Sequence, residues 1–248
     1  PEEWFEDSGL RPDTQKMITR LVYRRGNYLA FSDLLAVAPR LPDASERWRL
    51  CKTLSRRSTI FASLHLDAGS DVTALARYWG RGGRAKDVGA LLASVAQRPG
   101  GGEVDIAHLL PRGARSLLYT FPRPEDQVEG RKRDCHWTSL SFFQWTPDDR
   151  FLDGDEVARA FAEDYQFAEG PPVLGDIVGL VGPDRGMVHS CVYVAADIVF
   201  TKNGNSWDMP WVLSTLEDVQ SLYAATAQTP LSTVFLRGRG DGGEGDGP

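Results

Sequence analysis

The sequence of 248 residues has few cysteines, few lysines and no long apolar run. Its three cysteines are too few for a disulfide framework, and their odd number leaves at least one unpaired within the chain. No window approaches the roughly 18 consecutive apolar residues of a membrane helix, so we expect no membrane span. Only 5 of the 28 basic residues are lysine, which we interpret as a bias in the nucleotide composition of the gene and not as a functional feature.

Sequence motifs for metals and nucleotides are also missing. The chain contains no CxxC pair, no HExxH, no P-loop and no glycine-rich nucleotide motif, so we expect neither a metal nor a cofactor. The net charge of −6 gives no reason to expect a nucleic-acid partner. A hydrophobic fraction of 42% with 10% aromatics is ordinary for a globular protein and excludes a mostly disordered or collagen-like chain.

Charge is distributed unevenly along the chain. Residues 1–133 carry a net charge of +6 and residues 134–248 carry −12, which indicates two regions of different composition. The basic run Arg131–Arg133 precedes Cys135, where we expect it to help hold a thiolate or to attract an acidic substrate. The acidic N-terminus is not a signal peptide. The compartment stays open, with an exported or cell-envelope location favoured if a precursor carried a signal.

Helical periodicity fills the first part of the chain. We predict a helical region over residues 1–99 and a second domain over residues 103–237, joined by the Pro-Gly-Gly-Gly segment at 99–102. The glycine-rich, acidic residues 238–248 are predicted to be a disordered tail. The expected helices of the first region are 13–25, 31–37, 44–66, 71–80 and 86–97.

In the second region the spacing of apolar residues changes along the chain from that of helices to that of strands. Helices are expected near 104–110 and over 155–165, followed by β-branched, alternating segments that end in turn residues. This order predicts an α+β fold with consecutive antiparallel strands. The expected strands are 175–181, 187–195, 197–203 and 232–238.

Cys135 is the best candidate for a reactive group. It follows a charged loop and begins a helical segment, where the helix dipole lowers a thiol pKa and favours the nucleophilic thiolate. Such a nucleophile needs a base. His189 lies in an alternating strand, on one face with Cys191 and Tyr193, and a polar residue on an apolar strand requires a partner. His136 points about 100° away from its neighbour Cys135, so it is poorly placed.

The order of these motifs resembles the NlpC-type branch of the papain-like cysteine peptidases, which cut peptides of bacterial cell walls. The matching pieces are Asp134-Cys135, the segment GDIV at 175–178 and the segment HSCVY at 189–193, and the resemblance covers about residues 104–236. It implies a papain-like α+β domain with an antiparallel sheet packed on the nucleophile helix. It also implies Cys135 as nucleophile and His189 as base.

The third catalytic position is less clear. The family uses a polar residue about 12 positions after the histidine, which is Thr201 here, followed by Lys202 and Asn203. A lysine cannot accept the imidazole proton, so Asn203 is our choice to orient the ring, while Lys202 could bind a substrate carboxylate. His136 and Trp137 replace the serine and glycine that the family usually has after its cysteine.

Three aromatic residues are candidates for substrate binding. The resemblance implies that Tyr119 lines the site, and Trp207 and Trp211 could wall a groove or be buried. The leading hypothesis is a cysteine hydrolase that cleaves an amide bond through a thioester, with a peptide substrate such as a peptidoglycan fragment. The alternatives are a transglutaminase-like or acyltransfer enzyme, and a non-catalytic binding module on the same fold.

Overall fold

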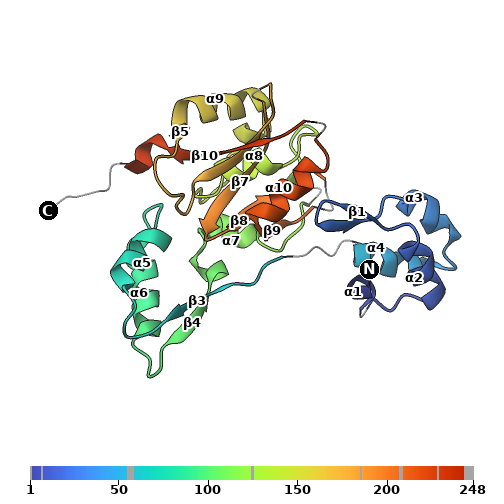
Figure 1. Cartoon of the computed structure of the whole chain (residues 1–248), viewed down its shortest axis with the longest axis horizontal. Coiled ribbons are helices and arrows are strands. Elements are labelled where there is room, and N and C mark those ends of the chain that lie inside the picture. The colour runs from blue at the N-terminus through green and yellow to red at the C-terminus, as the bar shows by residue number, and fades with distance from the viewer. Residues whose placement is uncertain are drawn as a thin grey trace. The chain divides into compact units, whose positions relative to one another are not determined.

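The structure is a computed structural model of the chain, and it describes residues 2–6, 8–54, 59–123, 126–184, 186–206, 209–227 and 229–242. Its contacts divide the chain into two compact units. The first unit comprises residues 1–58 and 217–230, and the second comprises residues 59–216 and 231–248. The elements are labelled in Figure 1.

The first unit is a small helical body with one hairpin. Its core consists of buried aliphatic side chains, including Ile18 and Leu50, which are fully buried. Gly26 has a positive φ of 62° in the β1–β2 turn, which an L side chain rarely adopts. The elements are α1 (Glu2–Phe5), α2 (Pro12–Thr19), β1 (Tyr23–Arg25), β2 (Tyr28–Ala30), α3 (Leu34–Val37), η1 (Ala38–Arg40), α4 (Ala44–Leu54) and α10 (Leu216–Ala224), whose first residue belongs to the second unit.

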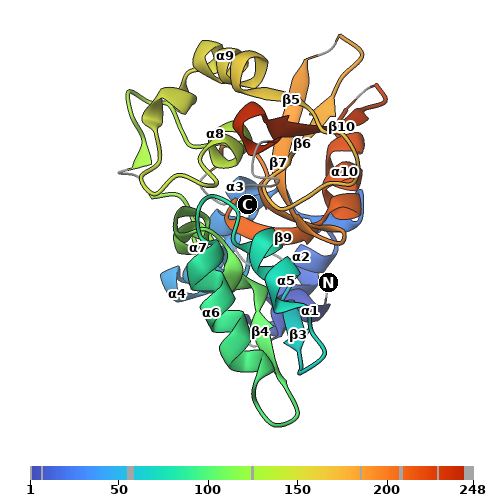
Figure 2. The same cartoon turned by 90° about the vertical axis from the view of Figure 1, so that its left-hand side faces the viewer.

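The second unit is built on a six-stranded sheet in the order β5-β10-β6-β7-β8-β9, in which every neighbouring pair is antiparallel. Figure 2 shows helix α8 lying against this sheet, with α9 beyond it. The strands are β5 (Tyr165–Phe167), β6 (Ile177–Val181), β7 (Met187–Ala195), β8 (Ile198–Lys202), β9 (Trp211–Thr215) and β10 (Ser232–Gly238). The accompanying helices are α7 (Arg112–Leu117), α8 (Cys135–Leu140), η4 (Asp149–Leu152), α9 (Gly154–Asp164) and η5 (Arg239–Gly242).

A hairpin and two helices complete the second unit, and they lie side by side in Figures 1 and 2. Strand β3 pairs with β4 in antiparallel register, and α5 packs on α6. Trp79 and Leu92 from these helices belong to the same apolar cluster as Trp137 of α8. These elements are β3 (Ser63–Leu66), α5 (Val72–Trp79), α6 (Ala85–Ala96), β4 (Gly102–Asp105) and η2 (Ile106–Leu109).

The predicted α+β class is confirmed, and so is the run of antiparallel strands β6, β7 and β8. The boundary expected at 99–102 is not where the contacts divide the chain. They divide it between residues 58 and 59, because β3 pairs with β4 across that expected linker.

Several elements differ from expectation. The helix expected over 13–25 ends at Thr19, and residues 23–25 form strand β1 because β2 pairs with them. Residues 63–66 form a strand instead of the end of a helix, because β4 supplies hydrogen-bond partners from a distant segment. Residues 102–105 are that partner strand, so only a short 3₁₀ turn follows where a helix was expected. Strand β9 was not predicted.

The predicted tail is only partly described. Gly238 ends β10 and residues 239–242 form the turn η5, whereas residues 243–248 lie outside the described residues. Among the described helices, none has the length and apolar character that a membrane crossing requires.

Candidate active site

Helix α8 begins at Cys135 because Asp134 caps it. The Asp134 Oδ1 accepts a hydrogen bond from the Trp137 backbone N–H at 2.9 Å, which satisfies one of the first amides of the helix. The Thr138 hydroxyl donates to the Asp134 carbonyl at 2.6 Å and strengthens the same turn. The cap places Cys135 in the first turn, as the sequence predicts, and Cys135 is buried with 5% of its surface exposed.

Helix α8 packs on β7, the strand that carries His189 and Ser190. The paired residues of β7 and β8 reach Val192 and Phe200, and the pairing does not extend to His189. The backbone N–H groups of Ser190, His136 and Cys135 itself favour the thiolate and act to lower the pKa of Cys135.

Ser190 fixes the start of α8 on the sheet. Its hydroxyl donates to the Cys135 carbonyl at 3.3 Å. The His136 Nδ1 lies 2.9 Å from the Ser190 hydroxyl oxygen. Since a hydroxyl has one proton, the His136 Nδ1–H is the donor in that second bond. The His136 ring also packs edge-on against Phe161 of α9.

His189 belongs to a chain of three polar side chains on the opposite face of β7 from Ser190. Its Nε2 lies 3.2 Å from the Thr201 Oγ1, and the Thr201 hydroxyl donates to the Asn203 Oδ1 at 3.1 Å. Because Thr201 gives its only proton to Asn203, the His189 Nε2 carries the hydrogen and Nδ1 is the basic nitrogen. The direct partner of His189 is thus Thr201, and Asn203 acts one step behind it.

Burial decides the charge state of both groups. It raises the pKa of the Cys135 thiol to about 12, with a smaller contribution from the Asp134 carboxylate. Burial also lowers the pKa of His189 to about 3, with His136 adding to the effect. The resting pair is a neutral thiol and a neutral imidazole. The expectation of a thiolate at rest is not met, because desolvation outweighs the effect of the backbone amides that favour the thiolate.

The basic residues before Cys135 do not stabilise its thiolate, because the two arginines pair with acidic side chains instead. Arg133 pairs with Asp126 at 2.8 Å and lies over the Trp137 ring at 4.5 Å. Arg131 pairs with Asp153 at 2.7 Å. The nearest charge that affects the pKa of Cys135 is the carboxylate of its own N-cap, Asp134.

Two residues expected to contact substrate are instead part of the core. Lys202 is fully buried, and its Nζ donates to the carbonyls of Gly204 and Ser206 at 2.7 and 3.2 Å. Trp211 is 1% exposed, and its indole N–H donates to the Thr138 hydroxyl of α8 at 2.9 Å. Alternation along β8 and β9 places both on the face that α8 covers, so neither binds substrate as predicted.

The other two predicted binding residues lie elsewhere. Trp207 lies outside the described residues. Tyr119 is 37% exposed and has a positive φ of 64°; its ring packs on Phe61 and its hydroxyl donates to the Ile60 carbonyl. The described contacts of Tyr119 are therefore with residues before β3 and with the backbone of β9, not with the Cys135 helix.

A pocket of about 280 Å³ opens between the loop before Cys135 and the loop after Asn203. Lys132 is exposed in it, whereas Arg133 is held by its ion pair. The lining residues are Pro122, Arg123, Asp126, Gln127, Lys132, Arg133 and Asn205.

Sequence reasoning did not identify Ser190 and His136 as parts of this site. The signal for Ser190 was present, because it follows the candidate base directly and is a polar residue in an apolar strand. The signal for His136 was weaker, since its role depends on Ser190 lying beside the helix start.

No group of three or more histidine, cysteine or acidic side chains suited to a metal ion occurs within the described ranges. A scan against known protein families finds no matching family, and a search of curated proteins finds no significant match.

Proposed function

We propose that this protein is a cysteine hydrolase with a papain-like, NlpC-type domain in its second unit. The observation that carries the proposal is a cysteine in the first turn of α8, which packs on β7, together with a histidine of that same strand whose ring lies beside Thr201 and, through it, Asn203. Cys135 is the nucleophile, His189 the base, and Thr201 the orienting residue, with Asn203 behind it.

Hydration of the site is the step that activates the pair. Desolvation is the largest cause of both pKa shifts, so a polar substrate or water that enters the site lowers the pKa of Cys135 and raises that of His189. The two pKa values then approach each other. Because His189 and Ser190 face opposite sides of β7 and Ser190 contacts the start of α8, transfer of the thiol proton to the His189 Nδ1 also requires β7 and α8 to shift so that the ring meets the sulfur. The thiolate attacks an amide carbonyl carbon and forms a tetrahedral oxyanion.

The protein's own amides serve the following steps. The N–H groups of Cys135, His136 and Ser190, which favour the thiolate, supply donors for the oxyanion; one such donor contributes roughly 3 kcal/mol to transition-state stabilisation. The C–N bond breaks, the His189 imidazolium protonates the leaving amine, and a thioester on Cys135 remains. Water activated by His189 then hydrolyses the thioester and releases the acid.

The substrate we propose is a peptide amide with an acidic group, such as a cell-wall peptide. The pocket between the two loops next to Cys135 and Asn203 suits one branch of such a peptide. Lys132 and Arg123 are exposed cations of this lining, and Lys132 would bind a carboxylate.

The test is digestion of purified peptidoglycan fragments, with new amino groups measured by dinitrophenylation and acyl-Cys135 measured by mass spectrometry. We expect the wild type and Cys51→Ala to release amines, and Cys135→Ala and His189→Ala to release none. Cys51 is a suitable control because it is exposed on α4 in the first unit. Absence of both released amines and acyl-enzyme, with amide substrates of varied charge, would rule the proposal out.

The closed resting site favours one alternative, a binding module that keeps the fold without catalysis. Its supporting observation is that Cys135 is only 5% exposed. A binding module would retain the same peptide in a pull-down with wild type and Cys135→Ala alike, without releasing any amine.

A further inference from the structure

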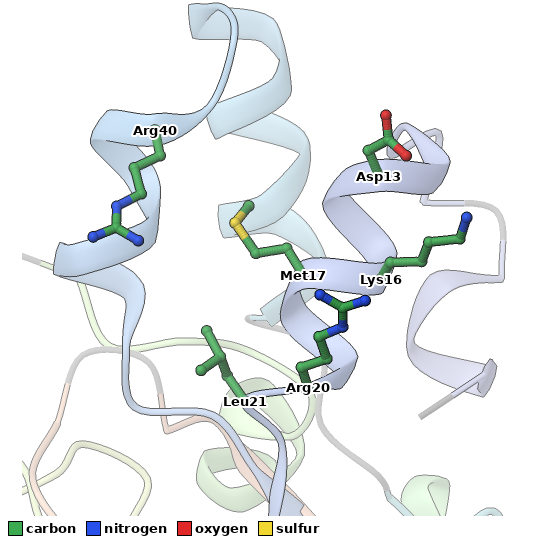
Figure 3. Close-up of a pocket in the computed structure, with 6 residues that line it drawn as sticks. All are labelled: Asp13, Lys16, Met17, Arg20, Leu21 and Arg40. Carbon is green, nitrogen blue, oxygen red and sulfur yellow. The ribbon is translucent and has the colours of Figure 1, made fainter.

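A hollow of about 370 Å³ lies in the first unit, between α2 and the turn η1. Figure 3 shows Arg40 on one side of it, Arg20 on the other, and Met17 and Leu21 between them, while the Lys16 side chain extends away from Arg40. The hollow belongs to the first unit alone, so it is a separate feature from the candidate active site. Its lining residues are Asp13, Lys16, Met17, Arg20, Leu21 and Arg40.

Charge in the hollow is unbalanced. Three cationic side chains face one acid, Asp13, so the lining carries a net charge of +2. In the part of the chain that the structure describes, no ion pair or hydrogen bond engages the side-chain charge of Lys16, Arg20 or Arg40. Other arginines of the same unit are paired, including Arg11 with Asp43 at 2.8 Å.

Such an arrangement is stabilised by an anion. Lys16 lies on α2 and Arg20 is the helical C-cap residue four positions later, so the two share a helix face and their like charges repel each other. Arg40 adds a third cation from a different element. A guanidinium matches two oxygens of a phosphate at once, which makes two arginines on facing walls suited to one phosphate group.

The size and the apolar wall narrow the ligand further. A volume of about 370 Å³ is near the lower end of the roughly 300–1,000 Å³ range of small-molecule sites. Met17 and Leu21 offer apolar surface between the cations, and Leu21 is 38% exposed. A phosphate monoester carries a charge of about −1.5 to −2 at neutral pH, which matches the net charge of the lining.

We infer that this hollow binds a phosphate monoester on an apolar group, held by Arg20 and Arg40 with Lys16 beside them. The phosphate can belong to a small soluble molecule or to a lipid headgroup, since both present the same chemistry. The apolar group packs on Met17 and Leu21.

The test uses the full chain. Phenyl phosphate and inorganic phosphate are titrated by calorimetry, and co-sedimentation is measured with phosphatidylcholine vesicles with and without phosphatidic acid. We expect saturable, salt-sensitive binding, with phenyl phosphate tighter than inorganic phosphate because the ring covers Met17 and Leu21. Binding of phenyl phosphate indicates a soluble ligand, and binding of phosphatidic acid vesicles alone indicates a headgroup; each supports the site.

The variants isolate the two arginines. Arg20→Gln and Arg40→Gln should each weaken binding about tenfold or more, because each removes charge-assisted hydrogen bonds. Arg20→Lys, which keeps the charge and loses the planar fork, should fall in between. Arg47→Gln is the matched control, since Arg47 is exposed on α4 outside the hollow. The inference is overturned if no probe binds saturably, or if Arg47→Gln weakens binding as much as Arg20→Gln.

Discussion

The Cys135 thiol should react slowly in the folded, substrate-free protein. With a pKa of about 12, roughly one Cys135 in 10,000 is a thiolate at pH 8. An ordinary cysteine with a pKa of about 8.5 is about one quarter thiolate at the same pH. Because the thiolate is the reactive form, Cys135 should be alkylated about 2,000-fold more slowly than an ordinary cysteine, before any further slowing by limited access.

The assay is timed alkylation with iodoacetamide, followed by digestion and mass spectrometry of each cysteine peptide. Cys51 is exposed and serves as the internal reference, while Cys191 is fully buried and should also react slowly. The rate at Cys135 should rise about tenfold per pH unit through pH 10, since the thiol remains far below its pKa. In denaturant the three cysteines should react at similar rates, which shows that all the thiols are intact.

One result would refute this reasoning. If Cys135 in the folded protein is alkylated as fast as Cys51 at pH 8, burial does not control its ionisation. The backbone amides that favour the thiolate would then outweigh desolvation, and the site would hold a thiolate at rest.

Three further predictions concern stability. His189 is buried and its pKa is lowered to about 3, so below pH 6.5 the unfolded chain binds more protons than the folded protein. Lowering the pH from 7 to 5 should therefore reduce the free energy of unfolding in urea by about 2 kcal/mol, and His189→Gln should lose this part of the pH dependence. Asp176→Asn should cost about 3 kcal/mol in the same assay, because the buried Asp176 carboxylate accepts two bonds from Arg237 at 2.6 and 2.9 Å. Glu156→Gln removes the half-buried partner of the exposed Arg159 and should cost less than about 1 kcal/mol; equal losses would contradict this. Gly175→Ala should lower the melting temperature more than Gly204→Ala, since both have φ near +90° but only at Gly175 would a Cβ meet the Phe143 ring; a similar drop in both would show that the ring moves aside.

Local patterns in the sequence were enough for the elements that carry the site. The helix start at Cys135 follows from Asp134, a residue type that caps helices, and strands β6, β7 and β8 follow from alternating β-branched residues. These signals act within a few residues of each other.

Pairings between distant segments could not be predicted in the same way. Strand β3 forms because β4 lies nearly 40 residues further along, and no local pattern names that partner. Strand β9 has the same cause, since it needs β8 as its neighbour. Trp211 was consequently expected in a loop, although it is part of a buried strand.

The sequence alone determined which residues could do the chemistry: a cysteine in the first turn of a helix, a histidine on an alternating strand, and polar residues twelve to fourteen positions later. Tertiary structure decided what those residues are in the folded state. Packing buries Cys135 and His189, and burial keeps both side chains neutral. It also places Thr201, and not Asn203, beside the His189 ring. The Lys202 side chain lies in the core. The reason is that burial and strand facing depend on every element packed around a residue, and most of those elements lie far from it in the chain.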